Sequence, residues 1–131
     1  MLKVLEERRK QRDRFVNMAR TYAEKLRGRL GKLTAIVYGS VSRGDFNLGS
    51  DVDVLIISEG LPHHPLERME VLYSCHESPL EPKGYTHDEF RALLAKRNSV
   101  LVDVLKEGMV VTDDLGLAHT NQFKEVREYG S

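Results

Sequence analysis

The chain has 131 residues, of which 40% are hydrophobic and 31% charged, and its formal net charge at pH 7 is zero. This length suits one domain with a buried core, and no apolar run approaches the ~20 residues of a membrane-spanning helix. The N-terminus lacks the apolar segment of a signal peptide, and the single cysteine, Cys75, excludes an internal disulfide or a multi-cysteine zinc site. We therefore expect one cytoplasmic domain spanning residues 1–131.

The charges are unevenly distributed along the chain. Residues 1–32 contain eleven Lys or Arg and four acidic side chains, whereas the remaining residues contain nine basic and sixteen acidic ones. Such asymmetry can mark a surface for a partner or for nucleic acid. The simpler interpretation, which we favour, is a solvated basic helix that offsets an acidic remainder.

The basic segment 1–32 is predicted to be one long amphipathic helix. From residue 6 to about residue 30 its apolar residues recur at three- and four-residue steps, as expected of a helix with one buried face. The residues that carry this pattern are Phe15, Val16, Met18, Ala19, Tyr22, Ala23, Leu26 and Leu30.

Two β-prone runs and a helix follow. Residues 33–38 and 52–57 are predicted strands, and residues 39–45 are predicted to begin with a helical turn between them. Pro65 suits the first turn of a helix that runs to about residue 75.

A third strand and two further helices complete the pattern. Residues 78–85 form the strand, which Pro79 and Pro82 confine to the edge of a sheet. Thr86 and Glu89 match a capping box at the start of the next helix.

The last predicted elements are a helix over residues 98–108 and a short strand at 109–111. The tail 113–131 is polar, with a possible short helix at 121–129. This order predicts a mixed α/β (α+β) fold, with a small mixed sheet and helices mainly on one face, whose catalytic core spans 33–112.

Asp51 and Asp53 are the most informative residues for function. Residues i and i+2 of a strand share a face, so both carboxylates are predicted to leave one side of the sheet together. Two neighbouring anions are tolerated best beside a cation or in open solvent, and the upstream Gly39-Ser40 turn offers a place for a phosphate. The simpler alternative is a hairpin with two solvated aspartates.

The motif is an ordered set in two parts: Gly39-Ser40-x-x-Arg43-Gly44 and, on the next predicted strand, Ser50-Asp51-x-Asp53. It resembles the signature of the DNA polymerase β-type nucleotidyltransferase superfamily, and especially its minimal single-domain members in bacteria and archaea. The resemblance covers about residues 33–112. A lone Asp-x-Asp would be a weak signal, whereas the ordered set is specific, and it implies a polymerase-β-like fold.

The resemblance implies a role for each residue of the Gly-Ser part. Gly39 and Ser40 would hold the β- and γ-phosphates of a nucleoside triphosphate, because glycine lets backbone N–H groups approach phosphate oxygens. Arg43 would contact phosphate or anchor the loop by pairing with Asp45. Ser50 would donate a further hydrogen bond at the phosphate tail.

The resemblance also implies two Mg²⁺ ions bound by Asp51 and Asp53, with a third carboxylate from the next strand. Glu81 is the residue available there, and we assign it as the third catalytic acid and metal ligand. It departs from the aspartate commoner in the family by one methylene group and by its neighbouring prolines. If Glu81 pointed away, the chain would bind nucleotide without turning it over.

The activity implied is Mg²⁺-dependent transfer of a nucleoside monophosphate, with ATP the favoured donor, to an acceptor hydroxyl with release of pyrophosphate. In this family the partner is often a small helical protein of the HEPN type, and in some toxin–antitoxin pairs that protein carries the acceptor, so the resemblance implies such a partner here. The alternative is a catalytically weak or inactive nucleotide-binding module that binds and neutralises such a partner. An exposed apolar helix edge would also suit a homo-oligomer.

A third alternative is RNA modification, in which basic residues between positions 8 and 14 grip phosphates. These residues are Arg8, Arg9, Lys10, Arg12 and Arg14. That interpretation predicts affinity that falls steeply with salt, and we consider nucleic acid the less favoured partner. The pair His63-His64 is read as a polar loop, because adjacent side chains diverge and no further ligand is suitably spaced.

Overall fold

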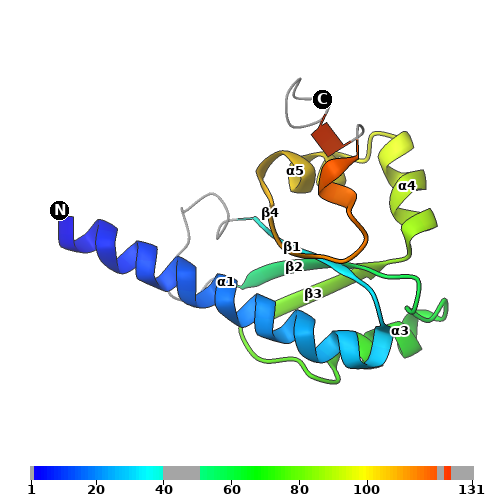
Figure 1. Cartoon of the computed structure of the whole chain (residues 1–131), viewed down its shortest axis with the longest axis horizontal. Coiled ribbons are helices and arrows are strands. Elements are labelled where there is room, and N and C mark those ends of the chain that lie inside the picture. The colour runs from blue at the N-terminus through cyan, green and yellow to red at the C-terminus, as the bar shows by residue number, and fades with distance from the viewer. Residues whose placement is uncertain (1, 40–50, 121–122, 125–131) are drawn as a thin grey trace.

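The computed structural model describes residues 2–39, 51–120 and 123–124 (Figure 1). The predicted order of helices and strands is confirmed over these residues. The elements are α1 (Leu2–Leu30), β1 (Thr34–Tyr38), β2 (Val52–Ile57), α3 (Pro65–Tyr73), β3 (Leu80–Tyr85), α4 (His87–Ala95), α5 (Ser99–Glu107), β4 (Met109–Asp113) and the 3₁₀ helix η1 (Leu117–His119).

The four strands form one mixed sheet in the order β3-β2-β1-β4. β1 is antiparallel to both β2 and β4, whereas β2 and β3 are parallel. β3 is therefore an edge strand, as Pro79 and Pro82 predicted, because a proline cannot donate a ladder hydrogen bond. The predicted α+β fold class is confirmed.

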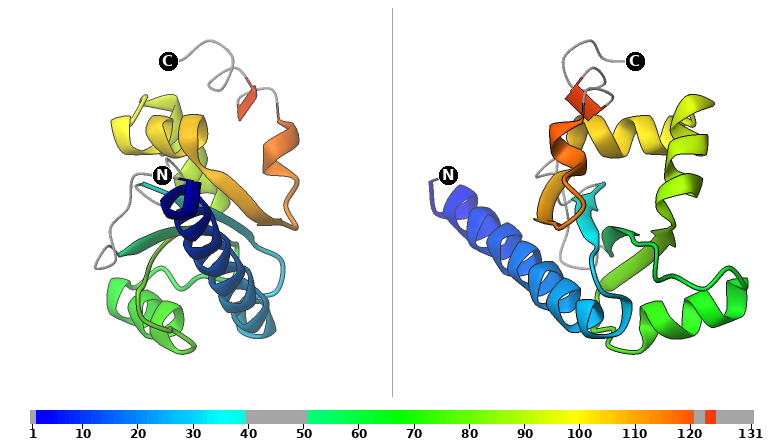
Figure 2. Two further views of the ribbon diagram at one scale, coloured as in Figure 1. Left: turned by 90° about the vertical axis from the view of Figure 1, so that its left-hand side faces the viewer. Right: turned by 45° about the vertical axis from the view of Figure 1, so that its right-hand side comes forward.

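The helices cover both faces of the sheet, and the expectation that they lie mainly on one face was wrong (Figure 2). α1 and α3 pack on the face that carries Val37 and Val54, and α4 and α5 pack on the face that carries Ile36 and Leu55. The physical reason lies in the central strands, because residues 34–37 and 54–57 are buried without alternation. A strand that is apolar on both sides needs a layer on each of them.

The helix ends follow the predicted capping residues. The Thr86 hydroxyl accepts from the Glu89 amide at 3.2 Å while the Glu89 carboxylate accepts from the Thr86 amide at 2.8 Å, which confirms the capping box. The Asn98 side chain caps α5 by accepting from the Val100 and Leu101 amides. Neither of these helices depends on its intrinsic propensity alone, since both caps satisfy amides that the helix leaves unpaired.

Both ends of the chain differ in detail from the prediction. α1 begins at Leu2, within the predicted helical segment 1–32, but the amphipathic pattern that was predicted from residue 6 is buried only from Phe15 onward. β4 continues to Asp113, because its last residues pair with Thr34 and Ala35 of β1. The predicted turn after Gly39 and most of the predicted helix at 121–129 lie outside the described residues, although 123 and 124 are helical.

Across the described part of the chain, no helix combines the length and the apolar character that crossing a membrane requires.

Candidate active site at the end of the sheet

Three strands meet at one end of the sheet with their side chains in register. β1 ends at Tyr38, and the antiparallel β2 and its parallel neighbour β3 begin at the same end. Tyr38 is paired with Asp53, and Asp53 is paired with Glu81, so these residues form one row across the three strands.

The row lies on the sheet face that α5 covers. Asp53 shares this face with Leu55, which is buried in the α4–α5 core, because side chains two residues apart on a strand point the same way. Glu81 is on the same face as its in-register partner. Asp53 is half-buried and Glu81 is exposed, so the row opens toward solvent at the β3 edge.

Gly39 ends β1 directly beside the Asp53 carboxylate. Its φ of +78° is in the left-handed region, which glycine adopts without strain. A Cβ atom placed on Gly39 would lie 2.6 Å from Asp53 Oδ2, well inside van der Waals contact. Both the backbone angle and the space therefore require glycine, and the glycine lets the Asp53 carboxylate lie against the chain.

The pKa of Tyr38 is raised by its surroundings in the row. Burial is the main cause that raises the pKa of Tyr38 to about 12, and the charges of Asp53, Tyr85 and Glu81 raise it further. The phenol is therefore protonated at neutral pH and keeps its O–H as a donor. The shift also indicates that the two carboxylates lie close enough to Tyr38 to affect its ionisation.

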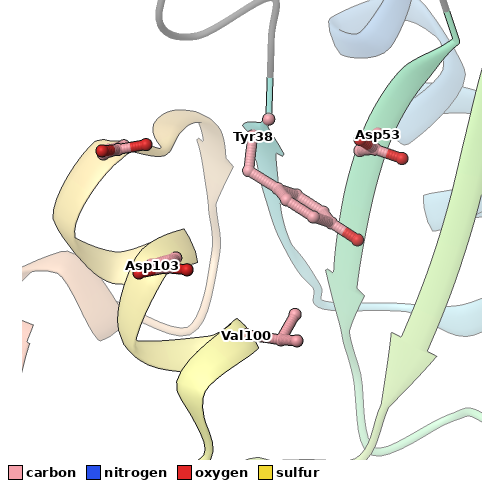
Figure 3. Close-up of a pocket in the computed structure, with 6 residues that line it drawn as sticks. Tyr38, Asp53, Val100 and Asp103 are labelled. Atoms are coloured by element: carbon pink, nitrogen blue, oxygen red, sulfur yellow. The ribbon is translucent and has the colours of Figure 1, made fainter.

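A cavity of about 160 Å³ lies between this row and α5 (Figure 3). α5 contributes Val100, Asp103 and Glu107 to the lining, and Figure 3 shows Val100 and Asp103 on α5 across from Tyr38 and Asp53. Sequence reasoning missed these residues, although their i, i+3, i+7 spacing places them on one face of the helix. The sequence offered one signal for them: they lie on a different face of α5 from the buried residues Leu101, Val104 and Leu105.

The cavity is electrostatically negative. Its described lining includes three carboxylates, those of Asp53, Asp103 and Glu107, and no Lys or Arg. α5 also ends at Glu107, so the negative end of its helix dipole lies there. The described lining therefore suits a cation better than an anion.

Comparison with known proteins places the chain in a family. The sequence profile described as "Nucleotidyltransferase domain" matches residues 19–125, which is most of the chain and includes every residue of the row and the cavity. The chain belongs to the nucleotidyltransferase domain family.

The comparison with solved structures supports the same fold. A Sulfolobus solfataricus protein, solved at 1.40 Å and provisionally assigned as a nucleotidyltransferase, superposes with a TM-score of 0.60 at 18% identity. The alignment covers 79% of this chain and 84% of that protein. At this identity the match bears on the fold alone. A search of curated proteins returned no match.

The candidate site contains some of the residues that the sequence singled out. Gly39 lies beside Asp53, and Asp53 is paired with Glu81 at the sheet end. Asp51 directly precedes β2 and is exposed. Ser40, Arg43 and Ser50, which were predicted to bind phosphate, lie outside the described residues.

The predicted set of three metal-binding acids is not assembled by the described residues. Among them, no group of three His, Cys, Asp or Glu side chains is arranged to hold a metal ion. Asp53 and Glu81 are neighbours, but Asp51 is not placed with them as a third ligand. The three-ligand metal site therefore stays a prediction.

The remaining candidates have structural roles. His64 caps α3, since its Nδ1 accepts from the Leu66 amide at 3.2 Å, and His63 is exposed. Tyr85 packs against the α4–α5 core. Cys75 is half-buried against the core that contains α1.

Proposed function

We propose that the protein transfers a nucleoside monophosphate from a nucleoside triphosphate, with ATP the favoured donor, to a hydroxyl of an acceptor. The observation that supports this proposal most is the in-register pair Asp53 and Glu81, with Gly39 packed against the Asp53 carboxylate. Family membership supports nucleotidyl transfer in general. The paired carboxylates at an open sheet end supply groups suited to that chemistry.

The bond changes of the proposed reaction are simple. The acceptor oxygen bonds to the α-phosphorus, the bond from that phosphorus to the oxygen bridging the β-phosphorus breaks, and pyrophosphate leaves. We assign Glu81 to receive the hydroxyl proton, because it is the exposed carboxylate at the outer end of the row, where an acceptor has access. Asp53 lies in the middle of the row, beside Gly39.

The carboxylate oxygens at this site are ligands of the type that Mg²⁺ prefers. Mg²⁺ prefers oxygen ligands and needs only one or two carboxylates when phosphates and waters complete its shell. Asp51, Asp53 and Glu81 are the residues that would hold it, and the negative cavity beside them favours a cation. When bound, it would neutralise charge on the triphosphate and make the attacking hydroxyl more acidic.

The phosphate side of the site is proposed at the end of β1. Gly39 leaves no side chain between its backbone and an incoming phosphate, and its left-handed φ turns the chain out of the strand. We propose that Ser40, Arg43 and Ser50 contribute the hydrogen bonds and positive charge that the β- and γ-phosphates need.

The acceptor is proposed to be a hydroxyl on a partner protein in the cytoplasm, of the small helical HEPN type, in a toxin–antitoxin pair. The support is the resemblance to minimal nucleotidyltransferases. The alternative function is a nucleotide-binding module that neutralises this partner without catalysis. It is favoured by one observation, namely that the described residues do not assemble three metal ligands.

Nucleotide binding is tested by thermal unfolding with ATP, GTP, CTP or UTP, each with and without Mg²⁺. A ligand at 100 times its Kd stabilises the folded state by about 2.7 kcal/mol, which raises Tm by several degrees. We expect the largest magnesium-dependent rise with ATP. Equal behaviour with all four nucleotides and no effect of Mg²⁺ would contradict the proposal.

Catalysis is tested by label transfer from α-³²P-ATP to a candidate partner. We expect Asp53→Asn to lower the rate roughly 10³-fold, because several kcal/mol of charge stabilisation is lost. Asp88→Asn is the matched control, since Asp88 is an exposed residue of α4 that pairs with Arg91 and does not line the cavity. The binding-module alternative holds instead if two results are obtained. The wild type transfers no label to the partner, and Glu81→Ala still neutralises the partner.

A further inference from the structure

Large apolar side chains are exposed at two separate places on the described surface. Leu2, Val4 and Leu5 at the start of α1 retain 78%, 55% and 58% of their exposure. Leu66, Met69 and Tyr73 on α3 retain 70%, 51% and 40%. The one other such residue that the described surface exposes is Val100, so the two groups account for nearly all of this apolar area.

The exposed start of α1, residues 2–10, does not pack on its own domain. All of these residues are exposed, and the helix projects beyond the body of the protein (Figure 1). The family match begins only at residue 19, so this segment precedes the part of the chain that resembles other nucleotidyltransferases. An isolated helix of this length is marginal in water without a surface to pack against.

The α3 group forms a continuous stripe. Leu66, Met69 and Tyr73 follow an i, i+3, i+7 pattern on the outward side of the helix, while Leu72 faces the core. Glu67 and Glu70 lie on the same short helix and are exposed. α3 thus presents an apolar stripe with acidic side chains beside it.

The two places carry opposite charge. Residues 3–14 contain six Lys or Arg and three acidic side chains, whereas residues 59–81 contain five acidic side chains and one basic residue, Arg68. Arg68 is already engaged, because its guanidinium donates to Glu89 at 2.7 and 3.3 Å. Apolar contact and charge complementarity therefore point to the same pairing.

One chain cannot bring its own two patches together. α3 lies beside the C-terminal half of α1, where the Tyr22 hydroxyl donates to the Leu72 carbonyl at 2.5 Å (Figure 2). Leu2 is at the far end of α1, and at 1.5 Å per residue it is about 30 Å from Tyr22 along the helix axis. Two chains with antiparallel α1 helices would bring each start of α1 to the other chain's α3.

We propose that the protein forms a two-fold symmetric dimer in which the first turns of α1 of each copy dock on α3 of the other copy. The dimer contains two identical contacts, so it closes and does not propagate into a filament. Leu2 and Leu5, three residues apart, supply the apolar face of α1, and Leu66, Met69 and Tyr73 supply the surface that receives it. This proposal is independent of the nucleotidyl-transfer proposal.

The test is the mass of the full chain in solution, measured by light scattering and sedimentation at ~1 µM to ~0.1 mM. We expect the wild type to have twice the mass of one 15.0 kDa chain. Leu5→Glu and Met69→Glu should each weaken the dimer at least ~100-fold, because each places an unpaired charge in both contacts. Circular dichroism unchanged from the wild type establishes that the variants fold.

Val100→Glu is the matched control for assembly. It makes the same kind of change at an exposed apolar residue, but on α5 and outside both patches. We expect this variant to remain dimeric. A monomer caused by Val100→Glu would contradict the assignment of the interface to α1 and α3.

Mixing the two interface variants separates this geometry from its alternatives. A heterodimer of Leu5→Glu and Met69→Glu has one intact contact, between the unchanged α1 of one copy and the unchanged α3 of the other. We therefore expect the mixture to associate more tightly than either variant alone and less tightly than the wild type. If the mixture associates no more tightly than either variant alone, the proposal is overturned. A wild type that stays monomeric, with the start of α1 binding RNA or another protein instead, overturns it as well.

Discussion

The carboxylates of this protein fall into two groups that differ in their surroundings. Glu89 and Asp114 each accept two hydrogen bonds from an arginine, Glu89 from Arg68 and Asp114 from Arg27. Asp53 and Glu81 lie instead at the end of the sheet, beside a cavity whose described lining is acidic and contains no Lys or Arg.

The first group connects elements that are distant in the sequence. Arg68 joins α3 to the capping box of α4, and Arg27 joins α1 to the turn after β4. Hydrogen bonds from Arg68 lower the pKa of Glu89. Burial raises the pKa of Asp114, but the Leu33 amide and Arg27 outweigh that effect and lower it. These carboxylates stabilise the fold in the absence of any ligand.

The second group has the opposite consequence. Neighbouring anions in a partly buried site repel one another, and the described lining of the cavity places Asp53 near Asp103 and Glu107. The comparison therefore separates carboxylates that join distant elements through an arginine from carboxylates that gather at the end of the sheet, where we propose that a cation and a triphosphate bind.

Of the substitutions that test the difference between the two groups of carboxylates, Gly39→Ala is expected to have the largest effect, which is on the rate of nucleotidyl transfer. The new Cβ would lie 2.6 Å from Asp53 Oδ2, so the carboxylate has to move. A displacement of about 1 Å in an active site can cost roughly 10²-fold in rate, and we expect a loss of that order in nucleotidyl transfer. The measurement is the initial rate of label transfer.

Gly31→Ala is the control for this substitution. Gly31 has the same φ of +78°, but nothing lies within 4 Å of a Cβ added there. Both variants should lose about 1 kcal/mol of stability from the left-handed backbone angle. Only Gly39→Ala should lose activity, and equal activities of the two variants would contradict the role given to the Asp53 contact.

A smaller effect, on stability, is expected from Arg68→Met. This change removes the hydrogen bonds of Arg68 to the Pro62 and Gly84 carbonyls and to the Glu89 carboxylate. We expect unfolding to become easier by about 1–2 kcal/mol at pH 7, a figure kept low because the Glu89 side chain is 39% exposed. Chemical denaturation of both proteins measures the difference.

The pH dependence of that difference has a definite sign. The pKa of Glu89 is lower in the folded state than its usual 4.5, so the stabilisation is present above pH 4.5 and is lost as the pH falls through the folded value. The wild type and Arg68→Met should therefore become more similar in acid. Arg91→Met is the control, because the Arg91–Asp88 pair is 60% and 81% exposed and should contribute little.

Much of the fold was predictable because local signals agree with the packing. The periodicity of α1, the capping box at Thr86 and the proline-bounded edge strand each indicated an element that the structure contains. The helices on the second face were misassigned because element order alone does not say which face a helix covers. The uninterrupted burial of residues 54–57 was the signal for two layers.

The site was predictable only along the strands. Asp53 and Glu81 stand out because each departs from an apolar or proline-bounded strand. Asp103 and Glu107 do not, because charged residues on the outer face of a helix are ordinary. Their place beside Asp53 depends on how α5 packs on β1, a contact between distant parts of the chain that no local pattern specifies.

The smallest expected effect concerns the ionisation of Tyr38. Its pKa of about 12 is due first to burial and then to the charges of Asp53, Tyr85 and Glu81. Asp53→Asn removes one of these charges, so the pKa should fall but stay above 10.0, since burial remains. NMR titration of tyrosine ring carbons measures the change directly.

This titration tests the row without requiring catalysis or a bound nucleotide. Because Tyr38 is the weaker acid in the folded state, its contribution to stability is complete below pH 10.0 and is lost as the pH rises toward about 12. Asp53→Asn should therefore narrow the pH range between 10.0 and the folded pKa of Tyr38, over which this stability is lost. Asp114→Asn, which alters a carboxylate of the first group, should leave that range unchanged. If Asp53→Asn left the pKa of Tyr38 where it was, Asp53 could not lie as close to Tyr38 as their pairing across β1 and β2 implies.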